Sequence, residues 1–326
     1  MPKSYTCSLE AIKDFWYVTH MLRPPGFLNA FLLFEGKESR WKDIPNLSCV
    51  PKKSETGGSG EIMRFRYHIP ESTCVDFPQN KFPVSAYAAL IDDISTWSII
   101  GDRANKSMRS GVSTHLSVHL GQGGLEGIGR NPGDAVDFEV EVIRIGRTMG
   151  FAHVNVHDVK SGATICTGRH AKFLPMGALF ETLFSENVLP LTKAYAGYLE
   201  RDVDPPLTAN EVEKLHDVVK FSNVSTSNES AEIKVKAHHC NPMGSLHGGC
   251  QAVFAEQMGR PAAKLILNKD FPTLKSINMT YFSSETKAAA LSVNPILVSK
   301  HDFKSSVMFR KVTDGRPISE AILDWC

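Results

Sequence analysis

The sequence predicts an α+β protein built from two similar units in tandem, each combining one long helix with an antiparallel sheet. Its length of 326 residues favours two domains. In each half, apolar residues at helical spacing precede four segments with the alternation of strands. The last hairpin of each half turns on a matching segment, VKSG at 159–162 and VTDG at 312–315. We therefore interpret the chain as an internal duplication.

The first unit, residues 61–176, follows an N-terminal extension, residues 1–60, which shows no sustained period. Residues 61–68 alternate apolar and charged side chains, which is typical of a strand with one buried face. Apolar side chains three and four residues apart then predict a helix over 84–101. Four strands are expected after it, at 112–120, 136–145, 151–159 and 164–173.

A helical connector, residues 177–228, is expected between the units. It contains a helical stretch at 178–199, then the interrupting prolines Pro205 and Pro206, then a short helix from Thr208 or Asn210. The prolines mark the boundary between the domains.

The second unit, residues 229–326, repeats the order of the first. A strand at 232–237 precedes a helix at 247–267, in which Pro261 is expected to kink or end the helix near Arg260. The remaining strands are expected at 275–282, 290–297, 305–312 and 318–325. Two such units bury their strand edges most economically against each other, as a pseudo-symmetric dimer within one chain.

Composition and charge argue against several classes of function. The 36 Lys and Arg nearly balance the 35 Asp and Glu, so the net charge of +1 offers no excess for binding nucleic acid or an anionic membrane. The 7 cysteines follow no disulfide framework, which favours a reducing compartment. No apolar run is long enough for a membrane span, and the N-terminus has no signal or transit pattern. We expect a soluble cytoplasmic protein, with the mitochondrion as the alternative.

The segment NPMGSLHGGC, residues 241–250, places glycines at the start of the second predicted helix. The first N–H groups of a helix lack internal partners and carry positive potential, so Gly248 and Gly249 could bind a developing oxyanion there. The side-chain amide of Asn241 could add another donor. Alternatively, the two glycines only let the helix pack tightly on a strand.

The same segment resembles a known family. Asn241 lies six residues before the His247-Gly248-Gly249 triplet, and Glu256 lies nine residues after His247. Together with the strand at 276–282, this pattern resembles the hotdog-fold acyl-CoA thioesterases of the 4-hydroxybenzoyl-CoA and phenylacetyl-CoA branch. The first half resembles the same family through different segments, at 90–96, 111–113, 144–148 and 168–172, and the whole is most similar to the human-type acyl-CoA thioesterases.

This resemblance implies an α+β fold of two tandem hotdog domains, each a long helix wrapped by an antiparallel sheet, paired as an intrachain pseudo-dimer. It also implies an active site between the two units, with Asn241, His247, Gly248 and Gly249 on the donor side. The equivalent donor positions of the first half have lost these residue types and read Phe77, Pro83, Val84 and Ser85.

The complementary side of the site survives in the first half. By the same resemblance, Asp92 corresponds to the nucleophile or general base and Ser113 to the hydroxyl that orients water. The sequence leaves the choice between the two routes open, and burial in the helix is expected to make Asp92 more basic. Asp93 is the alternative to Asp92. One composite site is therefore expected, whereas the mirror site around Glu256 should be inert or weak.

The implied substrate is an acyl-CoA, and no cofactor is needed beyond the coenzyme A that the substrate carries. Its phosphates call for a cationic rim, for which Arg147, Arg169 and Lys172 are the candidates. Alternatively, these three side chains only form solvated faces.

Other interpretations stay open. The chain could be an inactive scaffold or acyl-CoA-binding subunit, or a hotdog dehydratase, and a homo-oligomer or a protein partner could use residues 1–60. The glycine-rich connection at 121–133 could be a lid or merely a longer loop. A cluster of His and Cys around Cys240 lacks the usual spacing of a zinc site.

Overall fold

The structure is a computed structural model of the chain. It describes residues 8–22, 27, 31, 47–51, 61–74, 81–102, 104–185, 187–199, 214–224, 230–299, 301 and 303–326. The predicted helix from Thr208 or Asn210 begins outside these residues.

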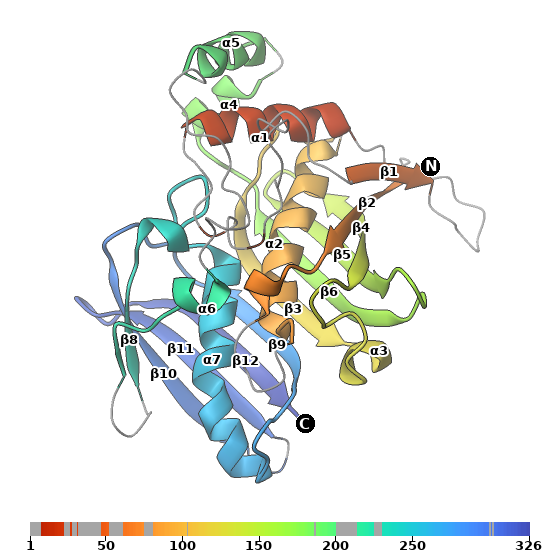
Figure 1. Ribbon diagram of the computed structural model, residues 1–326. Helices are drawn as coiled ribbons and strands as arrows, with labels where there is room; N and C mark the ends of the chain where they lie inside the picture. The colour runs from red at the N-terminus through yellow and green to blue at the C-terminus, as the bar shows by residue number, and fades with distance from the viewer. Residues whose placement is uncertain are drawn as a thin grey trace.

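One continuous antiparallel sheet and two long helices dominate the molecule (Figure 1). The strands of the sheet run in the order β1-β2-β4-β5-β6-β3-β9-β12-β11-β10-β8-β7. Outward from the central β3–β9 pair, each half of this order presents corresponding strands in the same sequence. The two halves are therefore arranged as the pseudo-symmetric dimer that the sequence predicts.

The first half contains the helix α2 (Val84–Gly101) and five strands. These strands are β2 (Glu61–His68), β3 (Val112–Leu120), β4 (Ala135–Ile145), β5 (Met149–Asp158) and β6 (Thr164–Phe173). The second half contains the helix α7 (Gly248–Leu267) and its own five strands. They are β8 (Ala231–Lys234), β9 (Leu274–Tyr281), β10 (Ala290–Ser299), β11 (Lys304–Lys311) and β12 (Pro317–Trp325). The long elements that the sequence predicts within the two units are present, within a few residues of their expected ends. The helical stretch expected at 178–199 is instead divided into two helices, α4 (Ala178–Leu183) and α5 (Leu189–Leu199).

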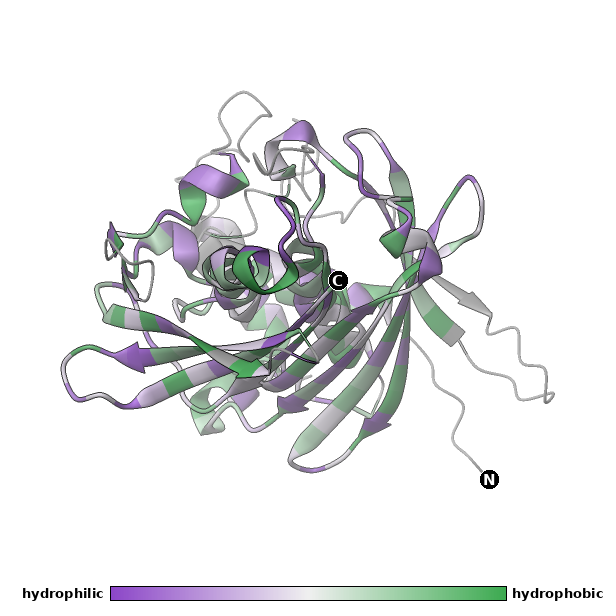
Figure 2. Cartoon of the chain, turned by 90° about the horizontal axis from the view of Figure 1, so that it is seen from below, coloured by the Kyte–Doolittle hydropathy of each residue, from purple (hydrophilic) through white to green (hydrophobic). Residues whose placement is uncertain are grey.

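The core lies between the sheet and the two helices. Inward-facing and outward-facing side chains alternate along the strands, as the burial of every second residue in β4 and the hydropathy colours of Figure 2 show. Almost every residue of α2 is buried, because α1 and α7 also pack against it. A polar side chain on α2 therefore lies in a dry environment.

The smaller elements lie at the periphery. They are α1 (Leu9–Leu22), β1 (Leu47–Pro51), η2 (Glu71–Thr73), α3 (Gln122–Leu125), α4 (Ala178–Leu183), α5 (Leu189–Leu199), α6 (Leu215–Val218), β7 (Asn223–Val224) and η4 (Ala237–His239). Among the described residues, no helix is both long and apolar enough to cross a membrane.

Part of the N-terminal extension belongs to the core of the first half. The strand β1 pairs with β2, and the side chain of Ile12 on α1 packs closely against Gly101 at the end of α2. The indole rings of Trp16 and Trp97 meet edge to face at 5.2 Å between centroids. The extension therefore adds a third layer over α2.

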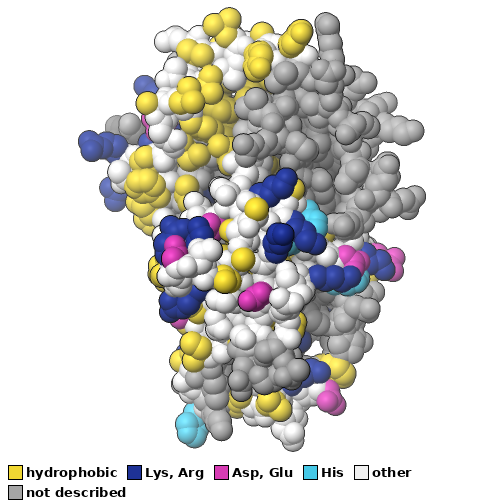
Figure 3. All heavy atoms as spheres, turned by 90° about the vertical axis from the view of Figure 1, so that its left-hand side faces the viewer, with side chains coloured by type: hydrophobic (Ala, Val, Ile, Leu, Met, Phe, Trp, Pro, Cys, Tyr) yellow, Lys and Arg dark blue, Asp and Glu magenta, His cyan; other side chains and the backbone are white. Residues whose placement is uncertain are grey.

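The connector covers α1 and leaves an apolar surface exposed. Phe180 and Phe184 pack against Phe15 of α1. Hydrophobic side chains gather over this region at the top of the face in Figure 3. The large hydrophobic side chains exposed on α4 and α5 are Leu179, Leu191, Tyr195 and Tyr198.

Two further expectations require correction. The helix α7 contains Pro261 but continues to Leu267, so it does not end near Arg260. The 121–133 connection is not a lid over the cavity described below, because it packs on β6. A Cβ on Gly124 would lie only 2.3 Å from the carbonyl oxygen of Ile165, so the absence of a side chain permits this contact.

Candidate active site

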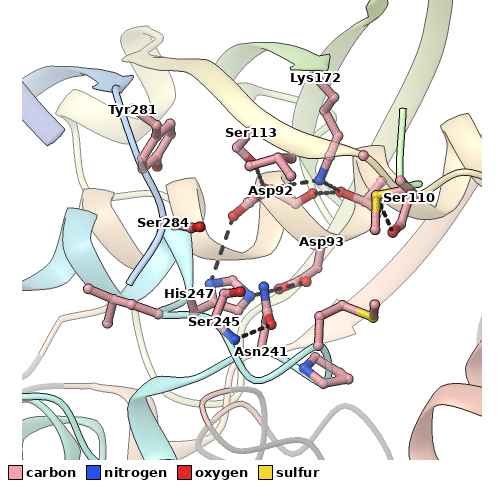
Figure 4. A pocket seen from close by; sticks show the side chains of 18 of the residues that line it. Asp92, Asp93, Ser110, Ser113, Lys172, Asn241, Ser245, His247, Tyr281 and Ser284 are labelled. Atoms are coloured by element: carbon pink, nitrogen blue, oxygen red, sulfur yellow. Dashed lines mark hydrogen bonds and ion pairs between the residues drawn. The ribbon is translucent and has the colours of Figure 1, made fainter. Parts of the chain in front are cut away.

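A cavity of about 310 Å³ lies where the two halves meet. Its walls come from α1, the middle of α2, the starts of β3 and α7, the ends of β6 and β9, and the 241–247 loop. Asp92 and Ser113 enter it from the first half, and Asn241, His247 and Gly248 from the second (Figure 4). The structure thus brings together the predicted groups from both halves.

Asp92 lies on α2 and is buried, with 6% of its surface exposed. Its Oδ1 accepts a hydrogen bond of 2.8 Å from the hydroxyl of Ser113 and lies 3.9 Å from the ammonium of Lys172. Its Oδ2 lies 3.8 Å from Nδ1 of His247 and faces the start of α7. One carboxylate oxygen is therefore held by the first half, while the other faces the second.

The expected increase in the basicity of Asp92 is wrong. Burial alone would raise the pKa of Asp92, but the neighbouring His170, Lys172 and His247 and the hydrogen bond from Ser113 lower it to about 2. Asp92 is consequently ionised throughout the physiological pH range.

His170 is a buried site residue that the sequence analysis did not select. Its Nε2 lies 3.0 Å from the Ser113 hydroxyl and 3.3 Å from Asp92 Oδ1, and its Nδ1 lies 2.6 Å from the Ser95 hydroxyl. Burial lowers the pKa of His170 to about 3, so the ring is neutral. Because Ser113 donates to Asp92, we infer that it accepts the Nε2–H of His170. The chain of hydrogen bonds fixes the orientation of the carboxylate.

Lys172 lies neither on an exposed cationic rim nor on a solvated face, the two positions that the sequence left open for it. It is buried, lines the cavity and donates a 2.8 Å hydrogen bond to the Thr96 hydroxyl. His170 and Lys172 alternate along β6 with the exposed Arg169, which points to the opposite face of the sheet. Arg147 is also exposed and does not line the cavity. Two of the three rim candidates thus lie away from the site, and the third lies beside Asp92.

His247 is the N-cap of α7. Its Nδ1 accepts the N–H of Gly249 at 2.9 Å, and its Nε2 lies 3.0 Å from the carboxylate of Asp93. Gly249 is therefore not a free oxyanion donor, which corrects the expectation for that residue. Instead it permits close packing, since a Cβ there would lie 2.4 Å from the Cα of Ala89 on α2.

Gly248 provides the free donor. Within the described part of the chain, its N–H has no hydrogen-bond acceptor. A Cβ on Gly248 would lie 2.7 Å from Asp92 Oδ2, so the two residues border one small space. Asn241 also faces the cavity, and its Oδ1 accepts the N–H of Ser245 at 3.1 Å (Figure 4). This bond leaves the amide group of Asn241 as the donor toward the cavity.

Asp93, the alternative to Asp92, is bound to His247. Burial raises the pKa of Asp93, against the opposing effect of His247. Its carboxylate contacts the imidazole, whereas Oδ2 of Asp92 faces the open space beside Gly248. The geometry therefore favours Asp92 as the reactive carboxylate.

Glu256 on α7 is the residue of the second half that corresponds to Asp92 on α2. Pro83, the N-cap of α2, makes no side-chain capping bond, and Glu256 Oε2 accepts the N–H of Ser85 at 2.9 Å instead. Glu256 Oε1 accepts a 2.6 Å hydrogen bond from Arg260. The carboxylate is thus used to cap one helix and to balance a buried guanidinium, and Glu256 does not line the cavity.

Glu256→Gln is expected to destabilise the fold by about 3 kcal/mol, because it leaves Arg260 without its anionic partner. Thermal and urea unfolding would measure the loss. Adding Arg260→Gln should recover part of it, since the two side chains interact directly. Equal stability of wild type and Glu256→Gln would contradict this structural role.

No set of three or more His, Cys, Asp or Glu side chains in the described ranges is arranged to hold a metal ion. In the predicted His and Cys cluster, His239 Nε2 contacts the carbonyl oxygen of Val218 at 2.7 Å. Cys240 and Cys250 are buried and are not joined in a disulfide.

The sequence matches no protein-family model and no curated protein. Solved structures nevertheless share its fold. A 12:0-ACP thioesterase from Umbellularia californica superposes with a TM-score of 0.52 at 11% identity, covering 81% of this chain and 97% of that one. A protein from Lactobacillus plantarum, assigned as an oleoyl thioesterase, gives a TM-score of 0.50 at 11% identity, covering 80% and 94%. These similarities confirm the α+β hotdog fold.

Proposed function

We propose that the protein hydrolyses acyl thioesters in the cavity between its two halves, with Asp92 and Gly248 as the central pair. The observation that supports this most is their convergence: Asp92 Oδ2 would lie 2.7 Å from a Cβ on Gly248, next to a free helix-terminal N–H. A carbonyl group in that space would meet an anion and a hydrogen-bond donor together, which is the arrangement that acyl transfer needs.

In the proposed reaction, the carbonyl oxygen accepts hydrogen bonds from Gly248 N–H and the Asn241 amide. Such donors contribute about 3 to 4 kcal/mol each in other hydrolases. Asp92 Oδ2 either takes a proton from the attacking water or attacks the carbonyl carbon to form an anhydride that water then opens. Either way the C–S bond breaks, the hydroxyl of water joins the acyl group and a proton of water joins the thiolate.

We propose acyl-CoA as the substrate class. The cavity of about 310 Å³ lies at the small end of the roughly 300 to 1,000 Å³ that ligand pockets span, which favours a thioester with a short or single-ring acyl group. The basic side chains that line the cavity are Lys172, 3.9 Å from the carboxylate of Asp92, and His247, which contacts the carboxylate of Asp93. The phosphates of coenzyme A therefore lie beyond the cavity in this proposal. Thioesters of acyl carrier protein carry the acyl group on the same pantetheine group, so they are tested as a second set of substrates.

The proposal is tested by thiol release from acetyl-, hexanoyl-, palmitoyl- and benzoyl-CoA and from the same acyl groups on acyl carrier protein. We expect turnover of short or aromatic acyl-CoAs. Turnover of carrier-protein thioesters alone would correct the substrate class. A folded protein that releases no thiol from any of them would overturn the enzymatic proposal. In that case, equilibrium binding of the same compounds would test the alternative of an inactive acyl-CoA-binding subunit.

The activity should depend on pH through His247. Burial and the charge of Lys172 lower the pKa of His247, whereas the carboxylates of Asp93 and Asp92 raise it. The carboxylates have the larger effect, so the pKa of His247 lies above 6.5. The second proton would bind Nδ1, the atom that accepts the N–H of Gly249 and faces Asp92. Protonation would therefore break the cap and place a cation beside the reactive oxygen.

We accordingly expect kcat/KM to fall as the pH decreases, with a midpoint above the 6.5 of an ordinary histidine. His247→Asn keeps a capping oxygen without the imidazole, so its acid limb should lie at a lower pH than that of the wild type and reflect the buried carboxyl of Asp93, whose pKa is raised by burial. A pH–rate series on both proteins measures this. An unchanged acid limb in His247→Asn would assign the limb to another group.

A further inference from the structure

Tyr281, at the end of β9, has a buried hydroxyl without a partner. The hydroxyl oxygen is inaccessible to solvent and makes no hydrogen bond within the described part of the chain. Tyr281 lines the cavity, and Figure 4 shows its hydroxyl end directed toward Asp92 and Ser284. Leaving a buried donor unpaired costs free energy, so the position requires an explanation.

Two other buried tyrosines show the usual arrangement. The hydroxyl of Tyr67 donates to the carbonyl oxygen of Phe31 at 3.0 Å, and that of Tyr87 donates to the carbonyl oxygen of Gly129. Both therefore satisfy their donors inside the protein. Tyr281 differs because its hydroxyl faces the cavity, where a ligand could accept the bond.

The position of the hydroxyl is specific. A Cβ on Gly248 would lie 3.0 Å from Tyr281 Oη and 2.7 Å from Asp92 Oδ2. The phenol, the carboxylate and the Gly248 backbone consequently border the same small space. A carbonyl oxygen that accepts the N–H of Gly248 there would also be within reach of Tyr281.

The protonation state suits a donor. Burial and the charge of Asp92 raise the pKa of Tyr281 well above 10.0, so the hydroxyl keeps its proton at neutral pH. A neutral phenol beside an ionised carboxylate can donate a hydrogen bond to a developing oxyanion but cannot serve as the base.

We propose that Tyr281 is a catalytic residue that donates a hydrogen bond to the thioester carbonyl oxygen, together with Gly248 N–H. This inference rests on the proposed function and adds a side-chain donor from the second half. The proton stays on the phenol throughout, and its hydrogen bond strengthens as the carbonyl oxygen becomes negative. The donor thereby favours the tetrahedral state over the bound substrate.

The test is Tyr281→Phe, which removes one oxygen and keeps the ring. We expect kcat to fall about 100-fold or more while KM changes little. Tyr67→Phe is the matched control: it removes a buried hydroxyl that already has a protein partner, so it should lower the melting temperature and leave kcat unchanged. Equal kcat for wild type and Tyr281→Phe would overturn the assignment.

A binding measurement separates a catalytic from a structural role and needs no turnover. The trifluoromethyl ketone CoA-S-CH₂-CO-CF₃ forms a tetrahedral hydrate, whereas S-propyl-CoA has no carbonyl oxygen. Tyr281→Phe should weaken binding of the ketone at least 10-fold and leave binding of the thioether unchanged. Equal losses for both probes would show that Tyr281 only shapes the cavity. A wild-type protein without turnover would overturn the proposed function, while the ketone would still test the donor.

Discussion

Asp92→Asn is expected to lower kcat/KM for thioester hydrolysis by a factor of about 10³ or more. The amide keeps the shape of the carboxylate but can neither attack the carbonyl nor accept a proton from water. Because Asp92 is ionised with a pKa of about 2, the wild-type reaction uses the anion at every physiological pH. Steady-state thiol release by the purified variant measures the effect.

The control for this variant addresses both folding and the choice of carboxylate. Asp92→Asn removes the carboxylate that lies 3.9 Å from the buried ammonium of Lys172, which is expected to destabilise the fold. In the double variant with Lys172→Met no buried cation is left unbalanced, so it serves as a second inactive form whose loss of activity is not caused by unfolding. Asp93→Asn should cost only about 10-fold, since Asp93 acts by orienting His247. If Asp93→Asn were inactive and Asp92→Asn active, the reactive carboxylate would be Asp93.

The long helices and strands could be predicted because the spacing of their apolar residues fits only one type of secondary structure. Apolar residues at helical spacing from Val84 onward can form a buried face only as a helix, and the structure has this helix over Val84–Gly101. The helix α1 was not predicted. Its apolar residues include Ile12, Phe15 and Trp16, but they lie in a segment of mixed composition, and the neighbour that buries them is distant in the chain.

The site could be predicted in part. Asp92, Ser113, Asn241, His247 and Gly248 all reach one cavity, although they come from distant segments. His170 was not selected and Lys172 was given an exposed role, because the sequence does not show which face of β6 is inward. Once His170 is placed beside Ser113, the alternation of the strand puts Lys172 on the same face. The capping of Gly249 likewise depends on a rotamer that no spacing specifies.

The asymmetry between the two halves has a simple physical origin. The first N–H groups of a long helix need an acceptor, and at α7 the imidazole of His247 supplies it. At α2 the capping position holds Pro83, whose side chain has no acceptor, and Glu256 reaches across from α7 and accepts the N–H of Ser85. A carboxylate that caps a helix is not available for chemistry. We infer that His247 keeps Asp92 free of the role that Glu256 has taken.

Gly248→Ala should separate activity from stability. The added methyl group would lie 2.7 Å from Asp92 Oδ2 and 3.0 Å from Tyr281 Oη, in the space that the reacting carbonyl occupies in the proposed mechanism. Displacing the substrate from that space is expected to reduce kcat/KM by about 10²-fold or more. The free energy of unfolding should change little. Alanine gains roughly 0.5 kcal/mol over glycine at a helical position, and this gain offsets the cost of shifting the two side-chain atoms.

Gly249→Ala is the matched control one residue along the same helix. Its Cβ would lie 2.4 Å from the Cα of Ala89, a backbone atom that can move only if α2 and α7 separate. This variant should lose about 1 to 3 kcal/mol of stability, as overpacked cores do. Urea unfolding and thiol release on both proteins give the comparison. An active Gly248→Ala would place the reacting carbonyl elsewhere in the cavity, whereas an inactive and fully folded one would locate the chemistry between Asp92 and the start of α7.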